Sequence, residues 1–164
     1  MNPTFQPVLP ARALGDVPVR VEVDGTSWAL FRDASGRPAA LEDKCPHRFA
    51  PLSKGRVVDG RLTCAYHGWN FDGRGEGRSP SQPALKGCRA GAAEVIERLG
   101  HLWLAPEGTT LEAFPFIDVK GYELAGSFTS HFEAPLHVAF DNFSEDEHTP
   151  WVHGFLGWEA SDAA

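Results

Sequence analysis

The chain of 164 residues lacks an excess of positive charge. It contains 15 Lys and Arg against 22 Asp and Glu, which gives a formal net charge of −7 with histidine neutral. No run of consecutive basic residues occurs anywhere in the sequence. Nucleic-acid-binding modules gain much of their affinity from a basic surface that releases counterions from phosphates. The composition therefore argues against nucleic acid as a partner.

Long apolar runs are missing as well. No stretch approaches the roughly 18 consecutive apolar residues that a membrane-spanning helix needs. The N-terminal segment MNPTFQPVLPARAL lacks the charged region and apolar core of a secretory signal. We therefore expect no membrane partner and residence in the cytoplasm.

Cysteine is scarce, with only Cys45, Cys64 and Cys88. An odd number of cysteines in a chain without a secretory signal argues against a disulfide framework. These residues are better explained as thiolate ligands or free thiols.

The patterns that are present are those of short strands. Apolar residues occupy every second position of residues 17–23, the period of a half-buried strand, and Asp24-Gly25 follows as a hairpin turn. Similar segments lie at 26–32, 38–42, 93–96 and 102–104, and Asp-Gly pairs recur at 59–60 and 72–73. Together they predict a small, mostly β domain of antiparallel hairpins.

The strand pattern stops near residues 105–108, so we expect a domain of residues 1–109 followed by a second region at 110–164. Residues 127–140 are again typical of a strand. Ser144 and Glu147 have the spacing of a capping box, which predicts a helix that begins at Ser144.

Two short motifs carry the chemistry. Cys45-Pro46-His47 and Cys64-Ala65-Tyr66-His67 each pair one thiol with one imidazole, and the Asp59-Gly60 turn lies between them. A hairpin that brings both motifs together would form a four-ligand site for a tetrahedral zinc ion, or for a 2Fe-2S cluster with cysteines on one iron and histidines on the other. A buried-thiol interpretation without metal remains the third alternative.

The segments CPHRFAPLSKG and CAYHGWNFDGRG resemble the two ligand loops of a Rieske iron-sulfur domain, in the version found in ring-hydroxylating and demethylating oxygenases. The resemblance implies an antiparallel β-sandwich over about residues 17–106. It also implies that Cys45 and Cys64 hold the inner iron, that His47 and His67 hold the outer iron, and that residues 79–83 form a covering loop. Phe49 departs from the pattern, because these oxygenases usually carry Gly there.

The same resemblance bears on the redox potential. In respiratory Rieske proteins a serine and a tyrosine donate hydrogen bonds to the cluster sulfurs, and Trp69 and Phe71 stand at those positions. Fewer donors stabilise the reduced cluster less. We therefore expect a potential toward the low end of the Rieske range of about −150 to +300 mV.

A second motif follows at Glu145, His148 and His153, which resembles the mononuclear iron motif of the same oxygenase family. The resemblance implies His148 and His153 as ligands of ferrous iron, and Glu145 in place of an Asp that passes electrons between subunits. It also implies the α+β start of a catalytic domain. Only 11 residues follow His153, so we expect this chain alone to be incomplete for catalysis. It would be part of a longer subunit, be completed by a separate polypeptide, or have kept only the electron-carrier half.

These resemblances together imply an oxidoreductase, a Rieske non-haem iron oxygenase. It would take electrons from an NAD(P)H-dependent reductase or a ferredoxin for O2-dependent hydroxylation or demethylation of a small organic substrate. A homotrimer is the implied assembly. The alternative is a stand-alone electron-transfer protein, and a less favoured one is a zinc-stabilised binding domain.

Overall fold

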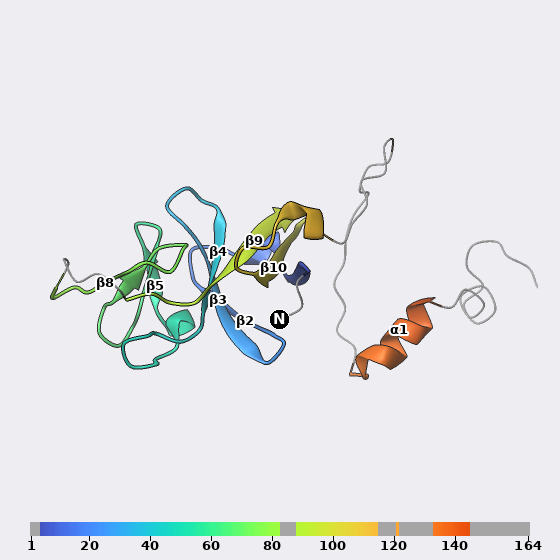
Figure 1. The fold of residues 1–164 in the computed structure, drawn as a ribbon, viewed down its shortest axis with the longest axis horizontal. Coiled ribbons are helices and arrows are strands. Elements are labelled where there is room, and N and C mark those ends of the chain that lie inside the picture. Colours follow the sequence, from blue (N-terminus) through green and yellow to red (C-terminus); the bar gives the residue numbers. More distant parts are fainter. Residues whose placement is uncertain (1–3, 83–87, 115–120, 122–132, 145–164) are drawn as a thin grey trace, which may run out of the picture. The chain divides into compact units, whose positions relative to one another are not determined.

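The computed structural model describes residues 4–82, 88–114, 121 and 133–144 (Figure 1). The chain divides into two compact units, residues 1–127 and 128–164. The first unit carries every described strand, and the second carries the helix α1 (Leu136–Ser144).

The first unit is built from two antiparallel sheets. The larger sheet has the strand order β1-β10-β9-β4-β3-β2, and the smaller sheet has the order β5-β6-β7-β8. The strands of the larger sheet are β1 (Gln6–Pro10), β2 (Val19–Val23), β3 (Thr26–Arg32), β4 (Pro38–Glu42), β9 (Ala92–Arg98) and β10 (His101–Pro106). Those of the smaller sheet are β5 (Arg56–Val58), β6 (Arg61–Thr63), β7 (Asn70–Phe71) and β8 (Gly77–Arg78). Three short 3-10 turns accompany them: η1 (Ala11–Ala13), η2 (Leu52–Lys54) and η3 (Leu111–Ala113).

Two-residue turns set the register of the predicted hairpins. Asp24-Gly25 joins β2 to β3, and Asp59-Gly60 joins β5 to β6, with positive φ at all four residues. Positive φ at both central residues matches the right-handed twist of the flanking strands. The sequence-based prediction of antiparallel hairpins in a mostly β fold is confirmed.

Strand β3 is buried on both faces because two hydrophobic clusters meet there. Ala29 and Phe31 pack with Leu62 and Phe71 of the smaller sheet, so this cluster fills the space between the sheets. Leu30, the residue between them, points into a second cluster on the opposite face of the larger sheet. The alternation follows from the two-residue period of a strand, and it produces the expected sandwich.

The N-terminal part of the unit differs from the prediction. The strand expected at residues 17–23 begins only at Val19, and Val17 is exposed. Strand β1 had no sequence signal, yet it pairs with β10 in the register Gln6↔Leu104. That pairing joins segments almost a hundred residues apart, which local periodicity does not reveal.

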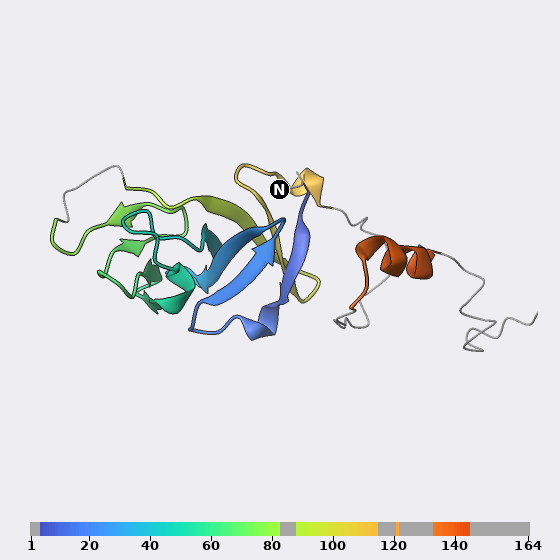
Figure 2. The ribbon, with the colours of Figure 1, turned by 90° about the horizontal axis from the view of Figure 1, so that it is seen from below.

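The smaller sheet lies at one end of the larger one in both views of the ribbon (Figures 1 and 2). The sheets approach closely at the Asp59-Gly60 turn, where a Cβ on Gly60 would lie 2.0 Å from the backbone nitrogen of Ala34. The segments before β5 and after β6 emerge at the other end of that hairpin. These two segments contain the candidate ligand loops.

The strand expected at residues 127–140 is wrong for residues 133–140, which the structure describes and which contain no strand. Helix α1 begins at Leu136, and the carbonyl of Pro135 accepts hydrogen bonds from Val138 and Ala139. The helix start predicted at Ser144 is also wrong, because α1 begins at Leu136 and Ser144 lies within it, where its hydroxyl donates to the carbonyl of Asp141. Residues 127–132 and Glu147 lie outside the described residues.

Membrane-spanning length is not reached by any helix within the described part of the chain.

Candidate metal centre

The first candidate ligand loop leaves the larger sheet at the end of β4 and enters the smaller sheet at β5. Two backbone hydrogen bonds close it. The N–H of Phe49 donates to the carbonyl of Cys45 (2.7 Å), and the N–H of Cys45 donates to the carbonyl of Ala50 (2.9 Å). Leu52 follows the loop and is fully buried, so the loop is anchored in the core where it ends.

The second candidate loop connects β6 to β7 and repeats the same pattern. The N–H of Gly68 donates to the carbonyl of Cys64 (3.1 Å), and the N–H of Cys64 donates to the carbonyl of Trp69 (2.7 Å). In both loops the cysteine therefore begins a five-residue turn that also contains a histidine. The two turns present equivalent donor sets.

Phe49 takes the place in the first loop that Gly68 takes in the second. Both residues have left-handed backbones, with φ of 59° at Phe49 and 72° at Gly68. In a non-glycine residue this conformation costs about 1–2 kcal/mol of conformational free energy. The departure from the family pattern at Phe49 thus leaves the loop shape intact and adds backbone strain.

This strain gives a test. We expect the Phe49→Gly chain to be about 1 kcal/mol more stable than the Phe49→Ala chain, because only glycine adopts positive φ without cost. Phe49 is 65% exposed, so the packing of its ring contributes little, and the comparison of the glycine and alanine variants involves no ring. The measurement is the urea midpoint at an unchanged slope.

Gly68→Ala provides the matched control, since a Cβ at Gly68 would make only an ordinary contact of 3.5 Å with Pro80. It should lose about the same 1 kcal/mol relative to the native chain. Equal stability of the glycine and alanine variants at position 49 would contradict the assignment of strain.

The four predicted donors form two contacting pairs, and the pairs differ in burial. Cys45 and Cys64 are buried, at 2% and 3% exposure, and their thiols are within hydrogen-bonding contact. His47 and His67 are exposed, with ring centroids 4.8 Å apart. The two thiols therefore form an inner pair and the two imidazoles an outer pair.

The inner pair is shielded from water, which affects its protonation. Burial raises the pKa of the Cys45 thiol to about 11, and the adjacent Cys64 thiol adds to the rise. Backbone N–H groups of His47 and Arg48 act in the opposite direction by hydrogen bonding to the Cys45 sulfur. A metal that binds here must displace the thiol protons, after which those N–H groups remain as donors to the sulfur.

Two aromatic side chains flank the outer pair. The indole of Trp69 stacks on the imidazole of His47, with centroids 5.3 Å apart and planes at 20°. The ring of Tyr66 lies 3.8 Å from that of His67, centroid to centroid. The stacking of Trp69 was missed by sequence reasoning, because it joins the second loop to a residue of the first.

The donor set fits a two-iron cluster. Among the described residues, no group of three or more Cys, His, Asp or Glu side chains is placed to hold one metal ion. Two pairs are present instead, one of sulfur and one of nitrogen donors. A Rieske 2Fe-2S cluster takes two cysteines on one iron and two histidines on the other, whereas a structural zinc ion takes all four ligands around one point.

The remaining predicted site residues, Glu145, His148 and His153, lie outside the described residues. Cys88, the third cysteine, is partly buried, and burial raises the pKa of its thiol. It belongs to neither ligand loop.

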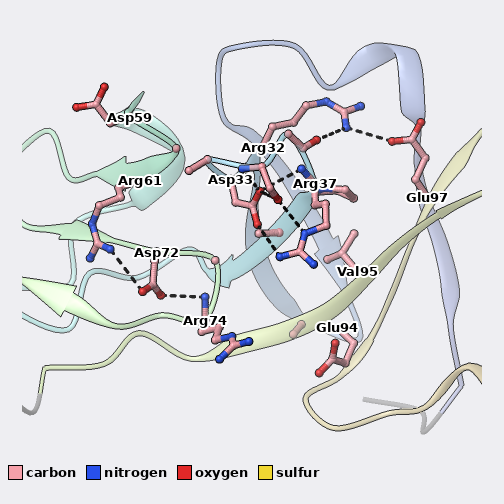
Figure 3. A pocket seen from close by; sticks show the side chains of 18 of the residues that line it. Arg32, Asp33, Arg37, Asp59, Arg61, Asp72, Arg74, Glu94, Val95 and Glu97 are labelled. Atoms are coloured by element: carbon pink, nitrogen blue, oxygen red, sulfur yellow. Dashed lines mark hydrogen bonds and ion pairs between the residues drawn. The ribbon is translucent and has the colours of Figure 1, made fainter.

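A cavity of about 1130 Å³ lies elsewhere, between the turn at residues 33–37, the Asp59-Gly60 turn and strand β9 (Figure 3). None of the four predicted donors lines it. Its charges are largely paired within the wall, by Arg32 with Glu97, Arg37 with Asp33, and Arg61 with Asp72. Each of these ion pairs lies within one sheet or its turns, so none of the three joins the two sheets, and the cavity is separate from the predicted donors.

Comparisons with known proteins agree with this geometry. Residues 4–95 match the family described as the Rieske [2Fe-2S] domain. The chain is 31% identical over 159 residues to chlorophyllide a oxygenase of Chlamydomonas reinhardtii, covering 93% of this chain and 25% of that protein. It is 34% identical over 151 residues to the oxygenase component of dicamba O-demethylase from Stenotrophomonas maltophilia, covering 85% and 44% respectively.

Among solved structures, dicamba monooxygenase bound to 3,6-dichlorosalicylic acid superposes with a TM-score of 0.64 at 34% identity, covering 69% of this chain and 35% of that one. The chain spans less than half the length of these relatives. The resemblance found in the motifs that begin at Cys45 and Cys64 is confirmed at the level of the family. This chain belongs to the Rieske [2Fe-2S] domain family, and it is similar to the N-terminal portion of Rieske oxygenase subunits.

Proposed function

We propose that Cys45 and Cys64 hold the inner iron of a 2Fe-2S cluster and that His47 and His67 hold the outer iron. The observation that carries this proposal is the separation of the donors into a buried thiol pair and an exposed imidazole pair. When bound, the cluster accepts and releases one electron at a time.

The residues around the site would determine which side of such a cluster is shielded from water and which side faces solvent. The buried cysteines exclude water from the inner side, and the N–H groups of His47 and Arg48 donate to sulfur there. The outer imidazoles face solvent, and Trp69 fixes the plane of His47 by stacking. Electrons would therefore enter and leave through the histidine side.

We further propose that the intact protein is a Rieske oxygenase. It would pass these electrons to a mononuclear non-haem iron held by His148 and His153, with Glu145 between subunits of a homotrimer. The reaction would be O2-dependent hydroxylation or demethylation of a small organic substrate, fed by a reductase or ferredoxin. Relatives named as an oxygenase and an O-demethylase support this class. Residues 1–109 would form the Rieske domain and 110–164 the start of the catalytic domain, in a cytoplasmic protein.

The second candidate is a stand-alone electron-transfer protein. It is supported by the presence of the whole proposed cluster site within the described first unit. This alternative needs neither Glu145 nor the two downstream histidines.

Iron and acid-labile sulfide per chain test these alternatives. About two irons and two sulfides per chain are expected for a loaded cluster, and a third iron is expected if the mononuclear site assembles. A colourless protein with one zinc per chain would overturn the cluster proposal. Loss of the third iron alone in a His148→Ala, His153→Ala double variant would assign that site.

The midpoint potential is a further expected outcome. Phe71 is fully buried and has no hydroxyl, and Trp69 stacks on His47, so neither residue supplies the O–H donors of high-potential Rieske proteins. We expect a midpoint toward the low end of the range of about −150 to +300 mV. A spectroelectrochemical titration measures it, and a value above roughly +200 mV would contradict the argument.

A further inference from the structure

Asp43 is a buried carboxylate at the base of the first ligand loop. Its side chain is only 2% exposed. One carboxylate oxygen accepts the backbone N–H of Ser53 at 2.6 Å, and the other accepts the hydroxyl of Ser53 at 2.7 Å. These two bonds close the loop, because Asp43 precedes the first ligand motif and Ser53 follows it.

The same residue is tied to the larger sheet. Its N–H donates to the carbonyl of Ser27 on β3 (2.8 Å), and the Nε of Arg20 on β2 lies 3.6 Å from its carboxylate. Arg20 also donates to the hydroxyl of Ser27 (2.6 Å). Contacts with β2 and β3 therefore hold Asp43 in place on the larger sheet, and its carboxylate in turn binds Ser53 at the end of the loop.

The topology gives this contact its importance. The second ligand loop begins and ends within the smaller sheet, between β6 and β7. The first loop starts on the larger sheet and ends on the smaller one. The spacing between the donors of the two loops thus depends on how the first loop is held across the junction of the sheets. The hydrogen bonds that Ser53 donates to Asp43 span that junction.

We infer that Asp43 is a positioning residue, which sets, through Ser53, the spacing between the donors of the first ligand loop and those of the second. The inference rests on the proposed function, because it assigns Asp43 a role in holding the donors of that site. A carboxylate suits the task, since a buried charge must be hydrogen-bonded and charge-assisted bonds are shorter and stronger than neutral ones. An apolar pair could close the loop, but it would not fix its orientation.

The first experiment uses the full chain without metal. In Asp43→Ala we expect the N–H groups of Cys45 and Phe49 to exchange with solvent at least about tenfold faster than in the native chain, whereas those of Cys64 and Gly68 keep their rates. Asp43→Asn should restore slow exchange, because its amide can accept from the Ser53 N–H and donate to the Ser53 hydroxyl. If Asp43→Ala does not fold, Ser53→Ala removes the hydroxyl bond alone and is measured in its place.

The second readout uses the chain loaded with iron and sulfide. Partners that orient metal ligands typically change metal affinity by about 10–100-fold when removed. We therefore expect Asp43→Ala to lose iron to a chelator at least about tenfold faster than the native chain, with an altered electron paramagnetic resonance spectrum of the reduced cluster. Asp43→Asn should keep the native spectrum.

Asp33 supplies the matched control. It accepts the N–H and the hydroxyl of Ser35 at 2.8 and 2.6 Å and lies 3.7 Å from Arg37, but in the turn between β3 and β4. Asp33→Ala should leave loop exchange, iron loss and the spectrum unchanged. Equal loop exchange in Asp43→Ala and Asp33→Ala would overturn the inference. A native chain that binds no iron would overturn the proposed function instead, and the exchange rates would still decide the role of Asp43.

Discussion

Replacing Cys64 by alanine is expected to lower the iron and sulfide content at least about tenfold, because one iron then keeps a single protein ligand. Cys64 is 3% exposed and contacts the Cys45 thiol, so no other described thiol can take its place without rebuilding the loop. Iron analysis and the visible absorption of the purified protein measure the loss. The fold itself should persist, since removing one buried sulfur leaves only a small cavity.

Cys88→Ala is the control for this result. Cys88 is partly buried and contributes to the same hydrophobic cluster, but it belongs to neither ligand loop. The variant should keep about two irons and two sulfides per chain. Full cluster content in Cys64→Ala, or its loss in Cys88→Ala, would contradict the assignment of the inner pair.

Gly55→Ala is expected to have the largest effect on folding. A Cβ at this position would lie 2.0 Å from the carbonyl oxygen of Thr63 and 3.0 Å from that of Leu52. Both are backbone atoms, which cannot move aside as the end of a flexible side chain could. Thr63 also directly precedes Cys64. We expect a loss of about 3 kcal/mol in unfolding free energy, together with impaired cluster binding, because the strands that carry the two loops must move apart.

Two other glycines separate steric from conformational effects. Nothing lies within 4 Å of a Cβ at Gly15, whose φ is ordinary, so Gly15→Ala should change stability by less than about 0.5 kcal/mol. Gly36 has equally open space but a φ of +79°, so Gly36→Ala should cost about 1 kcal/mol from the backbone alone. Urea unfolding of the three variants tests the order. A Gly55→Ala chain as stable as Gly15→Ala would refute the close approach of the loops.

Helix α1 shows where sequence patterns are ambiguous. Apolar residues at 134, 136, 138 and 140 alternate as in a strand, while those at 136, 139, 140 and 143 have helical spacing. Both periods are present in the same segment, and periodicity cannot separate them over so short a run. The Pro135 carbonyl, which accepts the first helical hydrogen bonds, resolves the ambiguity in favour of the helix.

The candidate site could be predicted from the sequence because the residues of each ligand motif are close together along the chain. Each ligand motif spans only a few residues, from Cys45 to His47 and from Cys64 to His67, and the Asp-Gly turn between them specifies a hairpin that brings both to one end. The chemical types of the donors then restrict the possible metals.

Tertiary structure alone decided which donors are buried and what holds them. The separation of buried thiols from exposed imidazoles, the stacking of Trp69 on His47 and the bonds from Asp43 to Ser53 all depend on contacts between different loops or sheets. So does the pairing of β1 with β10. Such contacts have no sequence period, because they are fixed by how the two sheets pack against each other, whereas turns and ligand spacings are fixed by the chain's own neighbours.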